Sequence, residues 1–224
     1  MKSILKISFV IIAFVAISLT SFAGKKVVRF SCSESDAKIF VDGKLMGNGQ
    51  LEIIIPSYAC IMVKVEKSAF LTGIIEFCNK PDFAPPPKTY YMQLEKDDSY
   101  DASEATDMAN LDIEIKTSKT EIEAWKLLSQ IITSDFDVVE VTDRETGYLR
   151  TAWVAQTFKQ RTIRTRMIVK LGSTDPLTYK IKLVSEYANT AQTSVKSDEL
   201  FKEWDRVLRK YKEIIHEVQT RLGN

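Results

Sequence analysis

The stretch from residue 197 to residue 223 constrains the fold of this chain more than any other. Its apolar residues recur at steps of three and four, which places them on one side of a helix: Leu200, Trp204, Val207, Leu208, Tyr211, Ile215, Val218 and Leu222. Ser197 stands where a helix would begin and Gly223 where it would stop. A helix of about 25 residues cannot leave such a stripe in water. We therefore predict a long C-terminal helix lying across one face of a sheet.

The first residues have the pattern of a secretory signal peptide. Lys2 and Lys6 precede an unbroken apolar run, residues 7–19, and small residues follow at the positions that a signal peptidase reads. A retained membrane anchor is the alternative, but the short run favours cleavage after Ala23. No cysteine follows the run at a lipidation position. We expect an exported protein, periplasmic or secreted, that is not lipidated and has no transmembrane segment after cleavage of residues 1–23.

Net charge does not name a partner for this chain. Removing the leader with its two lysines changes the formal charge from +1 to −1, so bulk electrostatics would not bring the protein to nucleic acid or to a membrane. Residues 97–110 are acidic and poor in bulky apolar side chains, as in a linker. The sequence thus predicts two domains, residues 25–96 and residues 111–224.

The first predicted domain reads as all-β. Apolar residues alternate with polar ones in short segments at 28–32, 39–41, 61–65 and 75–77. Asp42-Gly43 is a hairpin turn, and the prolines at 85–87 make a stiff loop before the last strand. These features predict a small β-sandwich or barrel.

Residues 37–44, Ala-Lys-Ile-Phe-Val-Asp-Gly-Lys, lead to Gly47, a hydrophobic strand and residues 63–70. This order resembles the PEGA-type domain of envelope proteins and covers most of the first predicted domain. The sequence departs from the family at residues 55–58, where the Pro-Glu-Gly-Ala string should fall, and at Ala69-Phe70, where the family has Gly-Tyr. The resemblance implies a non-catalytic surface module used for binding or spacing.

Two of the three cysteines are candidates for a disulfide. If the apolar residues of 61–65 and 75–77 point inward, Cys60 and Cys78 both point outward on neighbouring strands. Cys32 lies on the same inward face as Val28 and Phe30, and we expect it to be a small buried apolar residue. Three free thiols remain the alternative, because cysteine spacing alone does not fix connectivity.

The second predicted domain reads as an antiparallel sheet with two helices on one face, so the whole chain is expected to be α+β. A short strand at 111–115 precedes a helix opened by a capping box at 118–121. Four strands and the final helix follow, the strands at 136–141, 148–158, 161–171 and 177–187. Odd-numbered strand residues are mainly apolar and would face the helices, whereas even-numbered ones are often basic.

This element order resembles the helix-grip domains of the outer-membrane-assembly lipoprotein BamC and its relatives. The similarity rests on the order of elements and on the spacing between Ala124-Trp125 in the helix and Gly147-Tyr148-Leu149 at a strand start. It implies a helix-grip-like fold and offers no catalytic residue to carry over.

The sequence predicts no catalytic residue, no metal site and no cofactor, and we expect that the protein is not an enzyme. The single histidine, His216, falls off the apolar stripe and lacks partners for a triad. The cysteines do not have the spacing of zinc ligands. Asp135, Asp137 and Asp143 lack the glycine and glutamate of a calcium loop. A carboxylate-pair hydrolase stays formally open, since acidic residues are many.

The basic side of the predicted sheet is a candidate anion-binding face. Its residues are Arg150, Arg164, Arg166, Lys170, Lys180 and Lys182. The simpler interpretation is the solvated side of a half-covered sheet, where basic residues are common. The functional one is a platform for a phosphorylated glycan, a lipid headgroup or an acidic partner, because neighbouring arginines present parallel forks. Glu140 and Glu186 can neutralise this face.

The aromatic residues of the second domain allow an alternative function. A helix gripped by a curved sheet can leave an apolar cavity, and the candidate lining residues are Trp125, Trp153, Tyr179, Trp204 and Tyr211. The same residues can equally fill an ordinary core. Our leading expectation is a non-enzymatic interaction protein of the cell envelope, whose partner is an envelope component or another exported protein. The alternative is a carrier of a small apolar ligand.

Overall fold

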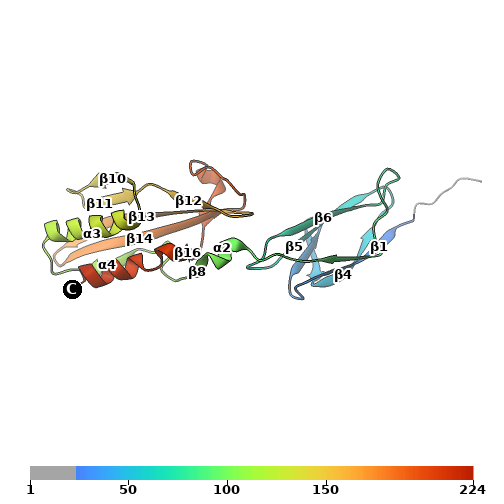
Figure 1. Ribbon diagram of the computed structural model, residues 1–224, viewed down its shortest axis with the longest axis horizontal. Coiled ribbons are helices and arrows are strands. Elements are labelled where there is room, and N and C mark those ends of the chain that lie inside the picture. The colour runs from blue at the N-terminus through green and yellow to red at the C-terminus, as the bar shows by residue number, and fades with distance from the viewer. Residues whose placement is uncertain (1–23, 224) are drawn as a thin grey trace, which may run out of the picture. The chain divides into compact units, whose positions relative to one another are not determined.

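The computed structural model describes residues 24–223 (Figure 1). The predicted signal peptide, residues 1–23, lies outside the described residues. The chain divides after Leu94 into two compact units, each with a hydrophobic core of its own. The fold is α+β and predominantly β, as predicted.

The first unit is a sandwich of two β-sheets. In the three-stranded sheet, β1 (Lys26–Cys32) lies between antiparallel β4 (Gln50–Ile55) and parallel β7 (Thr89–Met92). The four-stranded sheet is antiparallel and ordered β3-β2-β5-β6, with β2 (Lys38–Val41), β3 (Lys44–Asn48), β5 (Cys60–Glu66) and β6 (Gly73–Cys78). Alternate residues of the strands are buried between the sheets, which follows from the period-two pattern of the sequence.

The predicted hairpin turn joins β2 to β3. Asp42 and Gly43 both have positive φ angles, 48° and 80°, as a two-residue hairpin turn of the primed type requires. The carboxylate of Asp42 also accepts a hydrogen bond of 2.8 Å from the backbone N–H of Met62. This bond fixes the turn to the neighbouring strand β5.

The second unit is built on one open sheet with the strand order β10-β11-β13-β14-β15. A long hairpin of β13 (Thr162–Thr174) and β14 (Leu177–Ala188) forms its centre. The shorter strands are β9 (Ile113–Lys116), β10 (Val139–Asp143), β11 (Tyr148–Thr151), β12 (Val154–Thr157) and β15 (Lys202–Glu203). Strand β12 pairs with β13 beyond β11, and β9 pairs with β14.

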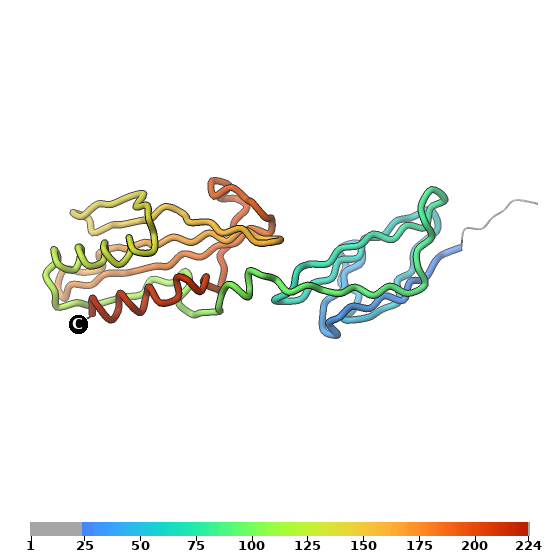
Figure 2. The backbone as a smooth tube through the Cα atoms, viewed as in Figure 1, coloured from blue at the N-terminus to red at the C-terminus, as the bar shows by residue number. Residues whose placement is uncertain are grey.

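Two helices, α3 (Glu121–Asp135) and α4 (Ile214–Leu222), cover one face of this sheet, as Figures 1 and 2 show. They bury their apolar residues against odd-numbered residues of β13 and β14, among them Ile163, Met167, Val169, Ile181 and Leu183. Helix α3 begins two residues later than predicted, since its capping box is formed by Thr120 and Glu123.

The prediction of one long C-terminal helix is wrong. Only α4 is α-helical, and the residues before it form two 3-10 turns and the short strands β15 and β16 (Arg206–Leu208). The backbone of β15 pairs with β14 and that of β16 pairs with β8 (Ser103–Ala105), so bonds between strands replace those of a helix. The apolar stripe is nevertheless buried except for Leu200, which is 54% exposed.

The prediction of a linker over residues 97–110 is also wrong. These residues belong to the second unit and form α2 (Asp98–Asp101) and β8. The buried carboxylate of Asp97 accepts hydrogen bonds from Ser99 at the start of α2, and the side chain of Asn110 bonds the backbone of Ser185 and Trp204. Polar side chains with such partners lie inside a fold, so a low apolar content did not mark a solvated segment.

Candidate functional site

The predicted basic face lies on the side of the sheet opposite the helices, and half of its cations pair with surface carboxylates. The pairs are Arg150 with Glu140 at 3.1 Å, Lys180 with Glu114 at 3.1 Å and Lys182 with Asp112 at 3.3 Å. Surface pairs of this kind contribute about 0–1 kcal/mol. Their main effect is to neutralise much of the face.

Arg164 is not part of an exposed platform, which corrects the sequence-based expectation. It is 3% exposed, and its guanidinium donates to the carboxylates of Glu186 and Asp198 and to the carbonyl oxygen of Val195 at 2.6–2.7 Å. The segment after β14 therefore returns over the sheet and covers this arginine. Arg164 serves to attach that segment to β13.

A stack of guanidinium groups and aromatic rings extends from Arg164 along the same face. The guanidinium carbon of Arg164 lies 4.0 Å from the ring centre of Phe201 and 4.1 Å from that of Trp153. The guanidinium carbon of Arg166 lies 4.0 Å from the Trp153 ring. Cation–π contacts at this distance hold both arginines against the ring.

Trp153 lies on the opposite face from the one predicted. Arg150 pairs with Ile168 but Val154 pairs with Thr165, so β11 and β12 together contain one residue more than the facing part of β13. This β-bulge reverses the alternation of side chains. Trp153 consequently contacts the arginines rather than the helices. No turn-forming residue stands at the bulge, so the sequence carried no signal for it.

Arg166 is a cation of this face that has no acidic partner within residues 24–223. Its side chain is half-buried, and among residues 24–223 it forms no ion pair. Its Nε is buried without a hydrogen-bond acceptor. Burial lowers the pKa of Arg166, and repulsion from Arg150 adds to this, while Glu186 acts in the opposite direction. An unbonded buried donor costs about 1–3 kcal/mol, and an anion bound at the exposed part of the side chain would offset the lost hydration of the charge.

Lys170 lies four residues further along β13 and is exposed. Within the described part of the chain it likewise has no ion pair. Arg166 and Lys170 are therefore the two candidates of the predicted face whose charge is open to a ligand.

The predicted cavity-lining residues mostly fill the core. Tyr179, Trp204 and Tyr211 are 1–3% exposed. The ring of Tyr211 stacks on Phe136 at 4.8 Å, and Trp125 packs on Tyr179 at 6.4 Å. Burial, with the charges of two nearby aspartates, raises the pKa of Tyr211 to about 12. These contacts are those of a packed interior.

A small hollow beside α4 has a volume of about 20 Å³. It is lined by Glu104, Thr106, Met108, Leu183, Val207, Lys212 and Ile215, and none of the five predicted aromatic residues borders it. Such a volume holds about one water molecule. Sites for small organic ligands are about 300–1,000 Å³, so this hollow is too small for an apolar cargo.

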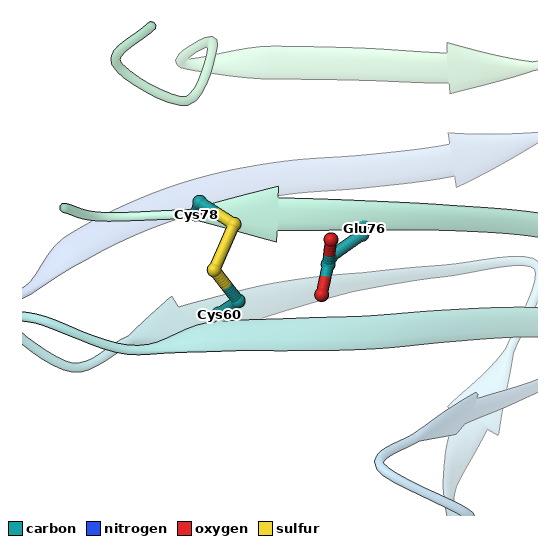
Figure 3. A group of neighbouring side chains, drawn as sticks. All are labelled: Cys60, Glu76 and Cys78. Carbon is teal, nitrogen blue, oxygen red and sulfur yellow. A yellow bond between two sulfur atoms is a disulfide. The ribbon is translucent and has the colours of Figure 1, made fainter. Parts of the chain in front are cut away.

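Cys60 and Cys78 form a disulfide across β5 and β6, with their sulfurs 2.00 Å apart (Figure 3). Cys32 is buried and free, and its thiol donates to the carbonyl oxygens of Glu34 and Gly49. The carboxylate of Glu76 lies within 4.8 Å of both bridged sulfurs. A metal ion requires thiolates, so the bridged sulfurs do not provide a metal site.

Among residues 24–223, no helix is both long and apolar enough to cross a lipid bilayer. Comparison with models of known protein families gives no match, and a search among curated proteins gives none either. The resemblances to PEGA-type and helix-grip domains therefore remain predictions that rest on residues and element order.

Proposed function

We propose that this chain is an exported, non-enzymatic interaction protein of the cell envelope, and that its second unit binds an anionic group of its partner. The partner would be an envelope component or another exported protein. The observation that carries this proposal is the half-buried side chain of Arg166, which lies against Trp153 on the side of the sheet opposite the helices and has no acidic partner among residues 24–223.

The energetics of Arg166 support binding at this face. A partly desolvated cation is costly when no anion offsets the lost hydration, and an incoming anion removes that cost. The guanidinium is held by the Trp153 ring at 4.0 Å, so little conformational freedom is lost when a ligand binds. Exposed Lys170 on the same strand adds a second open charge.

Export is supported by the disulfide between Cys60 and Cys78 and by the leader-like pattern of residues 1–23. Structural disulfides persist mainly in oxidising compartments, outside the cytosol. The PEGA-like pattern of residues 37–70 also fits a role in the envelope.

The packing of the second unit favours an interaction protein over the carrier of an apolar ligand. The rings of Tyr179 and Tyr211 contact other aromatic rings, and the hollow beside α4 has a volume of only about 20 Å³. A carrier would bind an apolar fluorescent probe saturably. The interaction protein would not.

Retention of the full exported chain on an immobilised envelope fraction tests the proposal. We expect Arg166→Gln combined with Lys170→Gln to lose most of the retention at low salt, because both open cations of the face are removed. A matched control, Lys126→Gln with Lys202→Gln, removes the same charge from exposed residues elsewhere in the second unit and should be retained like the wild type. Equal retention of both double variants would refute binding at this face.

A further inference from the structure

The ligand chemistry of the proposed site can be narrowed further. Resting on the proposed function, we infer that Arg166 binds a carboxylate of an acidic peptide segment, with an apolar residue of that segment packed beside Trp153. Three features of the surroundings support this assignment: the shape of the donor group, the neighbouring charges and the apolar flank.

The donor group is a planar guanidinium held in a fixed orientation. Its central carbon is 4.0 Å from the ring centre of Trp153, and the other guanidinium near that ring belongs to Arg164, which is fully engaged by its own partners. A guanidinium carries parallel N–H groups along its edges, and the ring contact limits its rotation. This fork matches the two oxygens of a carboxylate.

The neighbouring charges favour a ligand with a single negative charge. Glu186 lies on β14, next to the strand of Arg166, and Glu140 lies on β10, beyond β11; they are bound to Arg164 and Arg150 respectively. Both carboxylates act on the Arg166 charge, since each stabilises its protonated form. Their charges offset those of Arg150 and Arg164, so a ligand at Arg166 meets about one uncompensated positive charge, which a single carboxylate neutralises.

The flank of the site is apolar. Val184 lies directly opposite Arg166 in the register of β13 and β14, and Ile168 follows two residues along β13 on the same face. Val184 is 9% exposed and Ile168 is half-buried. A small free anion would leave Val184, Ile168 and the exposed part of Trp153 uncovered. A peptide with an apolar residue next to its acidic one would cover them.

The test titrates the oxidised full chain with the probe peptide acetyl-Gly-Leu-Glu-Leu-Gly-amide. Binding is monitored by NMR through the Arg166 Nε–H and Trp153 indole resonances. We expect saturable shifts of both resonances. The same peptide with Gln in place of Glu should bind at least about tenfold more weakly, because the hydrogen bonds lose their charge. Inorganic phosphate should also bind more weakly than the Glu peptide.

Two protein variants separate the site from its general charge. Arg166→Lys keeps the charge but loses the fork, and it should weaken the Glu peptide by about tenfold. Lys126→Gln removes one positive charge from the exposed side of α3, on the other face of the sheet, and should change binding by less than about twofold. The comparison of Glu and Gln peptides on the wild-type chain needs no variant, so it decides the question even if Arg166→Lys folds poorly.

Equal binding of the Glu and Gln peptides, or unchanged binding by a folded Arg166→Lys, would overturn the inference. So would tighter binding of phosphate, or shifts produced only by vesicles that contain phosphatidylglycerol. In these last two cases the proposed function stands, because an anion still binds at the face. If the envelope fraction retains the Arg166→Gln, Lys170→Gln double variant like the wild type, the proposed function fails as well.

Discussion

The guanidinium of Arg164 donates a hydrogen bond of 2.6 Å to the carboxylate of Asp198, which joins the start of β13 to a residue 34 positions further along the chain. Asp198 itself is 80% exposed, whereas the side chain of Arg164 is 4% exposed. The bond thus connects a buried cation to a surface carboxylate. It makes the segment after β14 a cover for one end of the basic face, and it divides that face into a structural part and an open part.

Arg164→Ala should destabilise the protein by about 3 kcal/mol, since removing one partner of a buried ion pair leaves the other charge uncompensated. The carboxylate of Glu186, 19% exposed, would lose its partner, and the ring contacts to Trp153 and Phe201 would be lost as well. Urea unfolding of the full chain measures the loss. Lys170→Gln on the same strand is the control and should change stability by less than about 0.5 kcal/mol. A loss below about 1 kcal/mol for Arg164→Ala would mean that the covering segment does not depend on this residue.

Trp204→Ala should cost about 3–5 kcal/mol, because the ring is 3% exposed in the core of the second unit and its removal leaves a cavity. Leu200→Ala is the informative control. Both residues belong to the stripe that the sequence suggested, but Leu200 is 54% exposed, so its truncation should cost less than about 0.5 kcal/mol. Comparable losses for the two variants would favour the long helix predicted from the sequence over the observed strands.

The C-terminal stripe shows what the sequence can and cannot determine. Its apolar spacing correctly predicts that Trp204, Tyr211 and Val218 are buried. It does not determine the backbone conformation, because β16 pairs with residues about a hundred positions earlier in the chain and this partner is not visible locally. The same long-range pairing explains why the sequence around residues 103–105 predicts a linker although these residues form β8.

The sequence predicts which basic residues share the candidate face, but it does not predict which of them are free of acidic partners. The even-numbered basic residues do share one face, and Glu140 and Glu186 do neutralise part of it. The open charge at Arg166 depends on Trp153, which reaches this face through a one-residue bulge that has no sequence marker. In contrast, Asp42-Gly43 determines its turn locally, so that hairpin was predicted correctly.

Mass analysis of the exported protein should find Gly24 at its N-terminus. This prediction rests on the apolar run and the small residues before the expected cleavage point. The cytosolic precursor, sampled when export is blocked, is the control and should keep residues 1–23. An exported form that retains Met1 would contradict a cleaved leader.

Peptide mapping without a reductant should find Cys60 linked to Cys78 and Cys32 free. Reduction should lower stability by about 3 kcal/mol, because the bridge closes a loop over a sequence separation of 18 and so restricts the unfolded chain. The double variant Cys60→Ser, Cys78→Ser should be insensitive to a reductant in the same unfolding experiment. A bridge that includes Cys32 would show that the register of β5 and β6 is different in solution.

Tyr211 should make the stability of the second unit depend on alkaline pH. Its pKa is raised from 10.0 to about 12 in the folded state, first by burial and then by the charges of Asp135 and Asp137. The folded state therefore keeps the phenol proton while the unfolded state loses it above pH 10, so the stabilisation is complete below pH 10 and declines as the pH rises towards 12.

Tyr211→Phe keeps the stack on Phe136 and has no proton to lose. We expect its unfolding free energy to match the wild type within about 1 kcal/mol at pH 8 and to exceed it by about 2 kcal/mol near pH 12. Urea unfolding at both pH values measures the difference, and parallel pH profiles of the two proteins would show that Tyr211 titrates normally in the folded chain.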